Sequence, residues 1–149
     1  MVVRRATTDD LVPLSEMGAR FLAASPLCGA ATLLEVRASL ASIVREEYRA
    51  AWVDEHHGVY RGMLLAAVCG LWFAPAVRIA TELAWWVDPE HRGSTAAVRL
   101  LEAFEAWAHS KGAVRLCMST LPDLGTTAQR MLEERGYAIA EKSWVKEVG

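Results

Sequence analysis

The spacing of apolar residues changes between the middle and the last third of this chain, and the change restricts the sheet that it can build. Residues 51–55, 59–73 and 78–87 are apolar runs separated by turn residues, which predicts three strands joined as an antiparallel meander. Residues 94–111 instead place apolar residues at helical spacing. Another apolar run follows at 113–119. A strand, a helix and a strand in this order predict a right-handed crossover with parallel strands.

Further elements flank this central part and complete an α+β order of β-α-α-β-β-β-α-β-α-β. Thr32 and Glu35 have the spacing of a capping box, which predicts the start of a helix. Trp85 and Trp86 are adjacent on a strand, so we expect them on opposite faces of the sheet. The flanking elements are a strand over 2–6, a helix capped by Thr8 that ends at Ser25, a helix from Thr32 to near Tyr48, a helix from Thr126 to Gly136 and a final strand over 137–148.

Length and charge limit the classes of protein that fit. The 149 residues suit one domain over 1–149. The 16 basic and 18 acidic side chains give a net charge of −2 without any basic run, which argues against a nucleic-acid partner. The longest uncharged stretch, residues 62–77, is too short to span a membrane and contains Gly70 and Pro75, so we interpret it as a core segment.

The cysteines indicate the compartment. Cys28, Cys69 and Cys117 are far apart and lack the spacing of a metal site. Each lies in an apolar stretch, which predicts buried free thiols in a reducing cytoplasm. The N-terminus carries no apolar run of the kind that a signal peptide needs, so we expect a cytoplasmic protein.

Chemistry is concentrated where the strand ending at Val87 leads into the helix that begins near Ser94. Gly93 and Ser94 are small enough for a ligand to approach the backbone, and a helix start offers unpaired N–H groups at its positive end. Arg92 adds a forked donor for an anion such as phosphate. Many helices start after a Gly-Ser turn and bind nothing, so the spacing alone leaves both interpretations open.

The residues of this segment read Val-Asp-Pro-Glu-His-Arg-Gly-Ser-Thr-Ala-Ala and resemble the acyl-CoA loop of the GNAT superfamily of N-acetyltransferases. The signature of that loop is Gln/Arg-x-x-Gly-x-Gly/Ala after a strand ending in Val-x-Pro. Arg92 matches the first position and Ala97 the last, while Thr95 stands where the middle Gly usually is. Residues 3–11 resemble the superfamily's first strand and helix, and residues 128–137 resemble its late Ala-x-x-x-Tyr-Glu-x-x-Gly-Phe segment.

The resemblance implies a mostly antiparallel mixed sheet with a V-shaped splay between its two central parallel strands, in which acyl-CoA is held. It implies transfer of an acetyl group from acetyl-CoA to a primary amine by direct attack, without a metal. Backbone N–H groups of the loop would hold the pyrophosphate, and the strand backbone before it would pair with the pantetheine amides. The expected acetyl-CoA contacts are Trp86, Val87, Arg92, Gly93, Ser94, Thr95, Ala96 and Ala97.

Glu82 is the candidate general base. It lies on the strand before the loop, close to where many members of the superfamily place a carboxylate that takes a proton from the amine. Partial burial would raise its pKa and make it a better base at neutral pH. The alternative is a structural Glu held in an ion pair, for example with Arg78.

Two departures from the superfamily pattern bear on function. Leu132 stands where many members carry a Tyr that protonates the leaving thiolate, and Gly125 where an Asn often contacts the pantetheine arm. Ser119 and Thr120, at the end of a strand, are other candidates to contact CoA or donate a proton. A non-catalytic acyl-CoA-binding or partner-binding module, and a structural domain without a ligand, remain open. The unpaired edge of the final strand predicts a homodimer.

Overall fold

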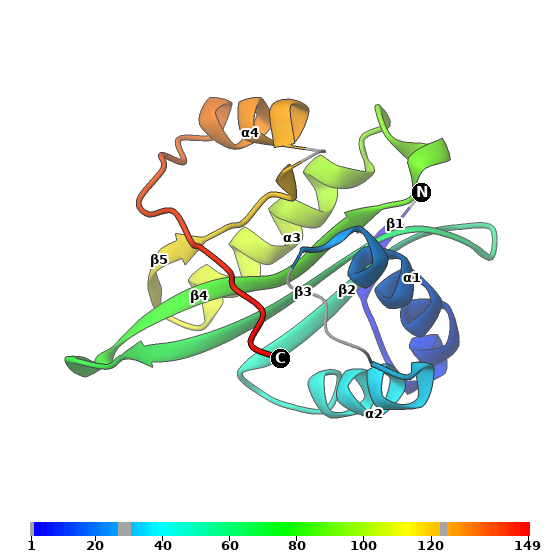
Figure 1. Ribbon diagram of the computed structural model, residues 1–149, viewed down its shortest axis with the longest axis horizontal. Helices are drawn as coiled ribbons and strands as arrows, with labels where there is room; N and C mark the ends of the chain where they lie inside the picture. Colours follow the sequence, from blue (N-terminus) through cyan, green and yellow to red (C-terminus); the bar gives the residue numbers. More distant parts are fainter. Residues whose placement is uncertain (1, 27–30, 123–124) are drawn as a thin grey trace.

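The computed structural model describes residues 2–26, 31–122 and 125–149 and contains one five-stranded sheet in the order β1-β2-β3-β4-β5 (Figure 1). Neighbouring strands are antiparallel from β1 to β4, whereas β4 and β5 are parallel. The sheet therefore confirms the predicted meander followed by a crossover. The elements are β1 (Val2–Arg5), α1 (Leu11–Ala24), α2 (Leu33–Ile43), β2 (Arg49–His56), β3 (Val59–Leu71), β4 (Ala74–Val87), α3 (Ala96–Ser110), β5 (Ala113–Cys117) and α4 (Gly125–Glu134), with short 3₁₀ turns at Thr8–Asp10 and Pro89–His91.

Two apolar cores lie on opposite faces of the sheet. Helices α1 and α2 pack with one face, and α3 packs with the other, where Leu132 of α4 joins it. Trp86 is buried in the first core, while Trp85 packs against the second, as the alternation of a strand predicts. The two adjacent indoles thus connect β4 to both layers of helices.

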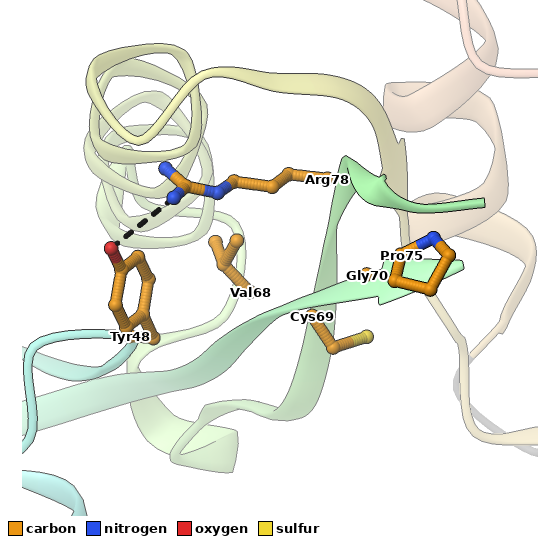
Figure 2. Close-up of a pocket in the computed structure, with 6 residues that line it drawn as sticks. All are labelled: Tyr48, Val68, Cys69, Gly70, Pro75 and Arg78. Atoms are coloured by element: carbon orange, nitrogen blue, oxygen red, sulfur yellow. Dashed lines mark hydrogen bonds between the residues drawn. The ribbon is translucent and has the colours of Figure 1, made fainter. Parts of the chain in front are cut away.

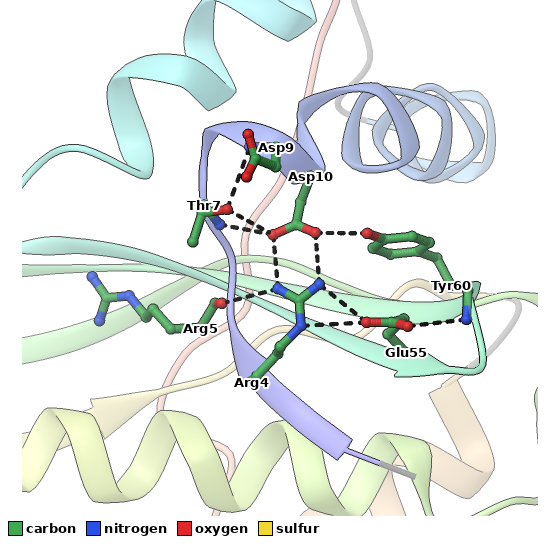
Figure 3. Close-up of polar contacts among 8 residues, drawn as sticks. Arg4, Arg5, Thr7, Asp9, Asp10, Glu55 and Tyr60 are labelled. Atoms are coloured by element: carbon green, nitrogen blue, oxygen red, sulfur yellow. Dashed lines mark hydrogen bonds and ion pairs between the residues drawn. The ribbon is translucent and has the colours of Figure 1, made fainter.

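An ion-pair cluster fixes β1 to the start of α1 (Figure 3). The Arg4 guanidinium donates to both carboxylate oxygens of buried Asp10 at 2.8 Å. The Tyr60 hydroxyl from β3 donates to Asp10 at 2.6 Å, and the Thr7 N–H donates to it at 2.8 Å. The Arg4 hydrogen bonds outweigh burial and hold the pKa of Asp10 well below its usual range. The Thr7 hydroxyl accepts the Asp9 N–H at 3.3 Å, so Thr7, rather than the predicted Thr8, caps the 3₁₀ turn that leads into α1.

The predicted final strand over 137–148 is wrong, because residues 137–149 contain no helix or strand. Their apolar side chains do not alternate: Glu141, Lys142 and Ser143 separate the apolar pair Ile139-Ala140 from the pair Trp144-Val145. The Trp144 side chain is 93% exposed, so a strand here would have no apolar face to bury.

Three other boundaries differ from the prediction. Helix α2 ends at Ile43 rather than near Tyr48, because its apolar face ends at Val44. The hairpin turn falls at Trp72-Phe73, not at Ala74-Pro75. Strand β4 tolerates Pro75 because pairing with β5 begins only at Arg78, so no partner on that side needs the missing N–H.

The prediction of buried thiols is also wrong within the described part of the chain. Cys69 and Cys117 are both free and exposed, and Cys28 lies outside the described residues. Cys69 lies two residues beyond Ala67, the last β3 residue that pairs with β2, and Cys117 ends the edge strand β5.

Candidate functional site

The site is positioned by the divergence of β4 from β5. Their parallel pairing ends at Thr81 and Cys117, yet β4 continues for six more residues to Val87. The register between β3 and β4 also shifts between Leu65 and Ala66, opposite the point of divergence. A bulge of this kind bends a strand and increases its twist. The two parallel strands therefore separate where the V-shaped splay is predicted.

Glu82 lies at the apex of this divergence, one residue beyond the last β4–β5 pair. It is only 9% exposed, and the Ser119 N–H from the chain after β5 donates to its Oε2 at 3.2 Å. Burial raises the pKa of Glu82 to about 7, with the Ser119 N–H opposing the shift. Arg78 does not pair with it, because that guanidinium donates to the Lys111 carbonyl and the Tyr48 hydroxyl. A buried carboxylate of this pKa can accept a proton near neutral pH.

The loop after β4 has the backbone that its residues predict. Gly93 has a φ of +84°, a conformation that disfavours side chains, and no atom lies within 4 Å of where its Cβ would be. Thr95, in the position of the usual middle Gly, has a φ of −77° and needs no glycine. The Arg92–Thr95 segment is exposed, and the helix begins at Ala96, which is buried.

Some backbone N–H groups at the start of this helix already donate hydrogen bonds within the protein. The Ser94 hydroxyl accepts the Ala96 N–H at 3.3 Å, and the Ser94 N–H donates to the His91 carbonyl at 3.4 Å. Both are long hydrogen bonds that a bound anion can replace. The positive end of the fifteen-residue α3 helix is thus exposed beside the end of β4.

Arg92 turns back onto the end of β4. Its Nε donates to the Val87 carbonyl at 3.0 Å, and its Cζ lies 4.8 Å from the centre of the Trp86 ring. These contacts place a positive charge between the strand end and the loop.

The ladder between β3 and β4 determines which backbone groups face the divergence. The Asp88 N–H donates to the Arg61 carbonyl at 2.9 Å, and Val87 is opposite Gly62. Hydrogen-bonded and non-bonded pairs alternate in an antiparallel ladder, so Trp86 directs its N–H and C=O toward β3. Trp85 and Val87 direct theirs to the side that β5 has left. The geometry thus favours the backbone groups of Trp85 and Val87, rather than those of Trp86, as the ones that could pair with the pantetheine amides.

A buried cluster that sequence reasoning missed stands at the start of the loop. Asp88 is 5% exposed and accepts two hydrogen bonds from Arg20 of α1, at 2.7 and 2.8 Å. The Trp86 indole Nε1–H donates to the same carboxylate at 2.7 Å. Burial opposes ionisation of Asp88, but the Arg20 and Trp86 hydrogen bonds outweigh it and lower its pKa. A charged residue directly after an apolar strand was the only sign of this cluster in the sequence.

Of the other residues that the sequence singled out for function, some lie near Glu82 and one lies in the apolar core. Ser119, whose N–H contacts Glu82, and the next residue, Thr120, are both exposed near the point where the strands diverge. Leu132 is 8% exposed in the apolar core, and Gly125 is the first residue of α4. Over the described ranges no group of three or more His, Cys, Asp or Glu side chains could hold a metal ion. Within those ranges, too, each helix is too short or too polar to cross a membrane.

A pocket of about 240 Å³ lies elsewhere, at the opposite end of the β3–β4 hairpin (Figure 2). The Arg78 guanidinium and the Tyr48 ring stack at its edge, 5.0 Å apart. This pocket adjoins the start of β4, whereas the loop follows the end of that strand, so it does not belong to the Glu82 site. Its lining residues are Tyr48, Val68, Cys69, Gly70, Pro75 and Arg78.

Solved structures of acetyltransferases share this fold. The aminoglycoside N-acetyltransferase AAC(6')-Iy in complex with CoA is 17% identical, with a TM-score of 0.80 over 99% of this chain and 93% of that chain. A predicted acetyltransferase from Clostridium acetobutylicum, solved with acetyl-CoA, is 13% identical, with a TM-score of 0.78 over 99% of this chain and 95% of that chain. The ribosomal-protein-alanine N-acetyltransferase from Brucella melitensis biovar Abortus 2308 is 14% identical, with a TM-score of 0.73 over 99% of this chain and 100% of that chain.

No curated protein sequence matches the chain. A family model does match, and it covers residues 24–137, which include the diverging strands, the loop and α3. The matched part is more than half of the chain, and its fold agrees with the structural neighbours. This protein belongs to the acetyltransferase (GNAT) family.

Proposed function

We propose that this protein is an acyl-CoA-dependent N-acyltransferase that transfers the acetyl group of acetyl-CoA to a primary amine. The observation that carries the proposal is the buried Glu82 carboxylate at the apex of the two diverging parallel strands, with a pKa of about 7. An exposed helix start with a basic residue beside it follows on the same strand. A base and an anion site at the two ends of one strand segment suit a substrate with both a reactive thioester and phosphates.

In the proposed reaction, the amine nitrogen attacks the thioester carbon directly. Glu82 takes the proton that the amine loses, a new C–N bond forms and the C–S bond breaks. Backbone N–H groups at the unpaired edge of β4, from Trp85 and Val87, would align the pantetheine arm and polarise the thioester carbonyl. The CoA thiolate leaves and takes a proton from water or from a nearby hydroxyl such as that of Ser119.

The loop would bind the pyrophosphate. Backbone N–H groups between Gly93 and Ala97 and the positive end of α3 supply the donors, and Arg92 supplies a positive charge. A helix dipole contributes only about 0.3–1 kcal/mol, so several N–H donors must share the binding. The structural neighbour AAC(6')-Iy has also been solved with a bisubstrate analogue, CoA-S-monomethyl-acetylneamine, which joins CoA to an amine acceptor.

Transfer is tested by incubating the protein with acetyl-CoA and a broad amine panel that includes small amines, peptides with free N-termini and peptides with Lys side chains. Release of CoA thiol and a mass gain of one acetyl group on an amine are expected. Glu82→Gln should remove most of this activity while leaving acetyl-CoA binding in place. Turnover that survives in Glu82→Gln at the rate of the unaltered protein would contradict the assignment of the base.

One observation favours a second function, a non-catalytic acyl-CoA-binding module. Leu132 is buried in the core and offers no hydroxyl where many family members carry a proton donor. This module would bind acetyl-CoA but acetylate no amine of the panel. Binding without turnover would therefore select the second function, and the absence of binding would exclude both.

A further inference from the structure

We infer that Arg20, on α1, is a positioning residue for the acyl-CoA loop and acts through Asp88; the inference rests on the proposed function. Arg20 lies 68 positions before Asp88 in the sequence and makes a two-pronged ion pair with it. Arg20 itself is outside the loop, and no step of the proposed reaction uses it. Its influence on acetyl-CoA would be exerted through the carboxylate that it holds.

Asp88 is fixed by contacts on its side chain and its backbone. Its Oδ1 accepts from Arg20 Nε and from the Trp86 indole, and its Oδ2 accepts from Arg20 Nη2. Its backbone N–H donates to Arg61 of β3, and its carbonyl accepts the His91 N–H at 2.9 Å. Asp88 thereby joins α1, the end of β4 and the first turn of the loop, so its side chain determines where the loop leaves the sheet.

The Trp86 indole transmits this positioning to Arg92. Asp88 holds one edge of the indole, and Phe21 of α1 packs edge-on against it with ring centres 6.4 Å apart. The Arg92 guanidinium lies over the face of the same indole. Arg20 and Phe21 are neighbours on α1, so one turn of this helix orients both the carboxylate and the ring that carries Arg92.

Charge gives Arg20 a second effect. Asp88 is a buried anion directly before a loop that would bind two phosphate charges, and such a carboxylate repels them unless it is paired. Among the described residues, Arg20 is the ion-pair partner of Asp88. The Arg20 side chain is 46% exposed, whereas the Asp88 side chain is buried. Loss of Arg20 would leave the carboxylate unpaired, whereas loss of both charges would remove the repulsion.

The test measures the dissociation constant of acetyl-CoA by calorimetry for the unaltered protein and for four variants. Arg20→Gln should weaken binding about tenfold, because it leaves Asp88 unpaired. Arg20→Gln/Asp88→Asn should return binding to within about threefold, because the Asn amide oxygen can still accept from Trp86. Arg20→Lys, which retains the charge, should also stay within about threefold, and Arg37→Gln on the exposed surface of α2 serves as the matched control.

A merely structural role gives a different pattern. The double variant would then bind at least as weakly as Arg20→Gln, and that result would overturn the inference, as would unchanged binding by Arg20→Gln. Arg20→Gln is compared only if it folds, which circular dichroism without ligand shows. If it does not fold, Arg20→Lys is compared with the double variant. Near-normal binding by both supports the inference, and tenfold weakening of both overturns it. An unaltered protein that binds no acetyl-CoA would overturn the proposed function itself.

Discussion

At the scale of single residues, the proposed chemistry depends on Glu82. Its carboxylate must be deprotonated to accept a proton, and its pKa is about 7. The value of kcat/KM should therefore rise with pH through about 7 and then level off. Glu82→Gln should lower kcat/KM by about 10²–10⁴-fold and remove this rise. The check is a pH–rate profile with Glu134→Gln, on the exposed side of α4, as control; a profile that is unchanged in Glu82→Gln would refute the assignment.

Glu82 should also reduce the stability of the fold. Its pKa is raised from 4.5 to about 7, so between these pH values the folded protein holds a proton that the unfolded chain has released. Stability therefore falls as pH rises through this range. Glu82→Gln should raise the free energy of unfolding at pH 8 by up to about 3 kcal/mol, and by much less at pH 4.5. Urea denaturation at the two pH values measures this, and equal effects at both would contradict the burial of a charged group.

Single residues differ in how well the sequence predicts them. Glu82 and Arg92 could be proposed from the sequence alone because both lie close to the Gly93 loop along the chain. Asp88 and Arg20 could not be paired, because only the packing of α1 against the sheet brings them together. The sequence likewise does not reveal toward which neighbour the Trp86 backbone N–H and C=O point, because this depends on the register between β3 and β4.

At the scale of elements, the loop before α3 depends on one backbone conformation. Gly93→Ala should destabilise the fold by about 1–2 kcal/mol, because its φ of +84° disfavours a side chain although nothing crowds the site. It should weaken acetyl-CoA binding as well. Thr95→Gly, at a φ of −77°, gains nothing from glycine and should cost no more than about 1 kcal/mol. Chemical denaturation compares the two, and a larger loss for Thr95→Gly would contradict the assigned backbone.

Elements with a strong and continuous pattern were predictable. Helix α3 shows a clear apolar face, and the capping box of Thr32 and Glu35 forms at the start of α2. The errors fall where tertiary context decides. The sequence predicts a break at Pro75, but this residue lies in the part of β4 that has no partner on the β5 side. The apolar residues over 137–148 predict a strand, but nothing in the described sheet pairs with them.

At the scale of the whole molecule, β5 forms an edge with which no further described strand pairs, and several apolar side chains are exposed. Trp144 and Val148 in the C-terminal segment and Trp72 at the hairpin tip are each at least 90% exposed. Open edges and apolar surface are usually covered, so we expect a homodimer at micromolar concentration. Light scattering after size-exclusion chromatography should give twice the mass of 16.4 kDa. A monomeric mass would contradict this expectation.

The topology as a whole was the most predictable level. The change from strand to helix spacing determines the order of the sheet, and the residues of the loop predict an anion site at the end of β4. The proposal that acetyl-CoA is the ligand concerns the assembled molecule, because acetyl-CoA would contact both the diverging strands and the helix start. Acetyl-CoA binding is therefore the property on which the account depends most.

The most direct test is a thermal shift with acetyl-CoA on three proteins. The unaltered protein should be stabilised by about 2.7 kcal/mol at a hundred times the dissociation constant. Arg92→Ala/Ser94→Glu should lose the shift, whereas Arg37→Ala/Ser39→Glu, the same change on the exposed surface of α2, should retain it. No shift in the unaltered protein at millimolar acetyl-CoA would mean that the loop is only the start of a helix and would contradict the transferase function.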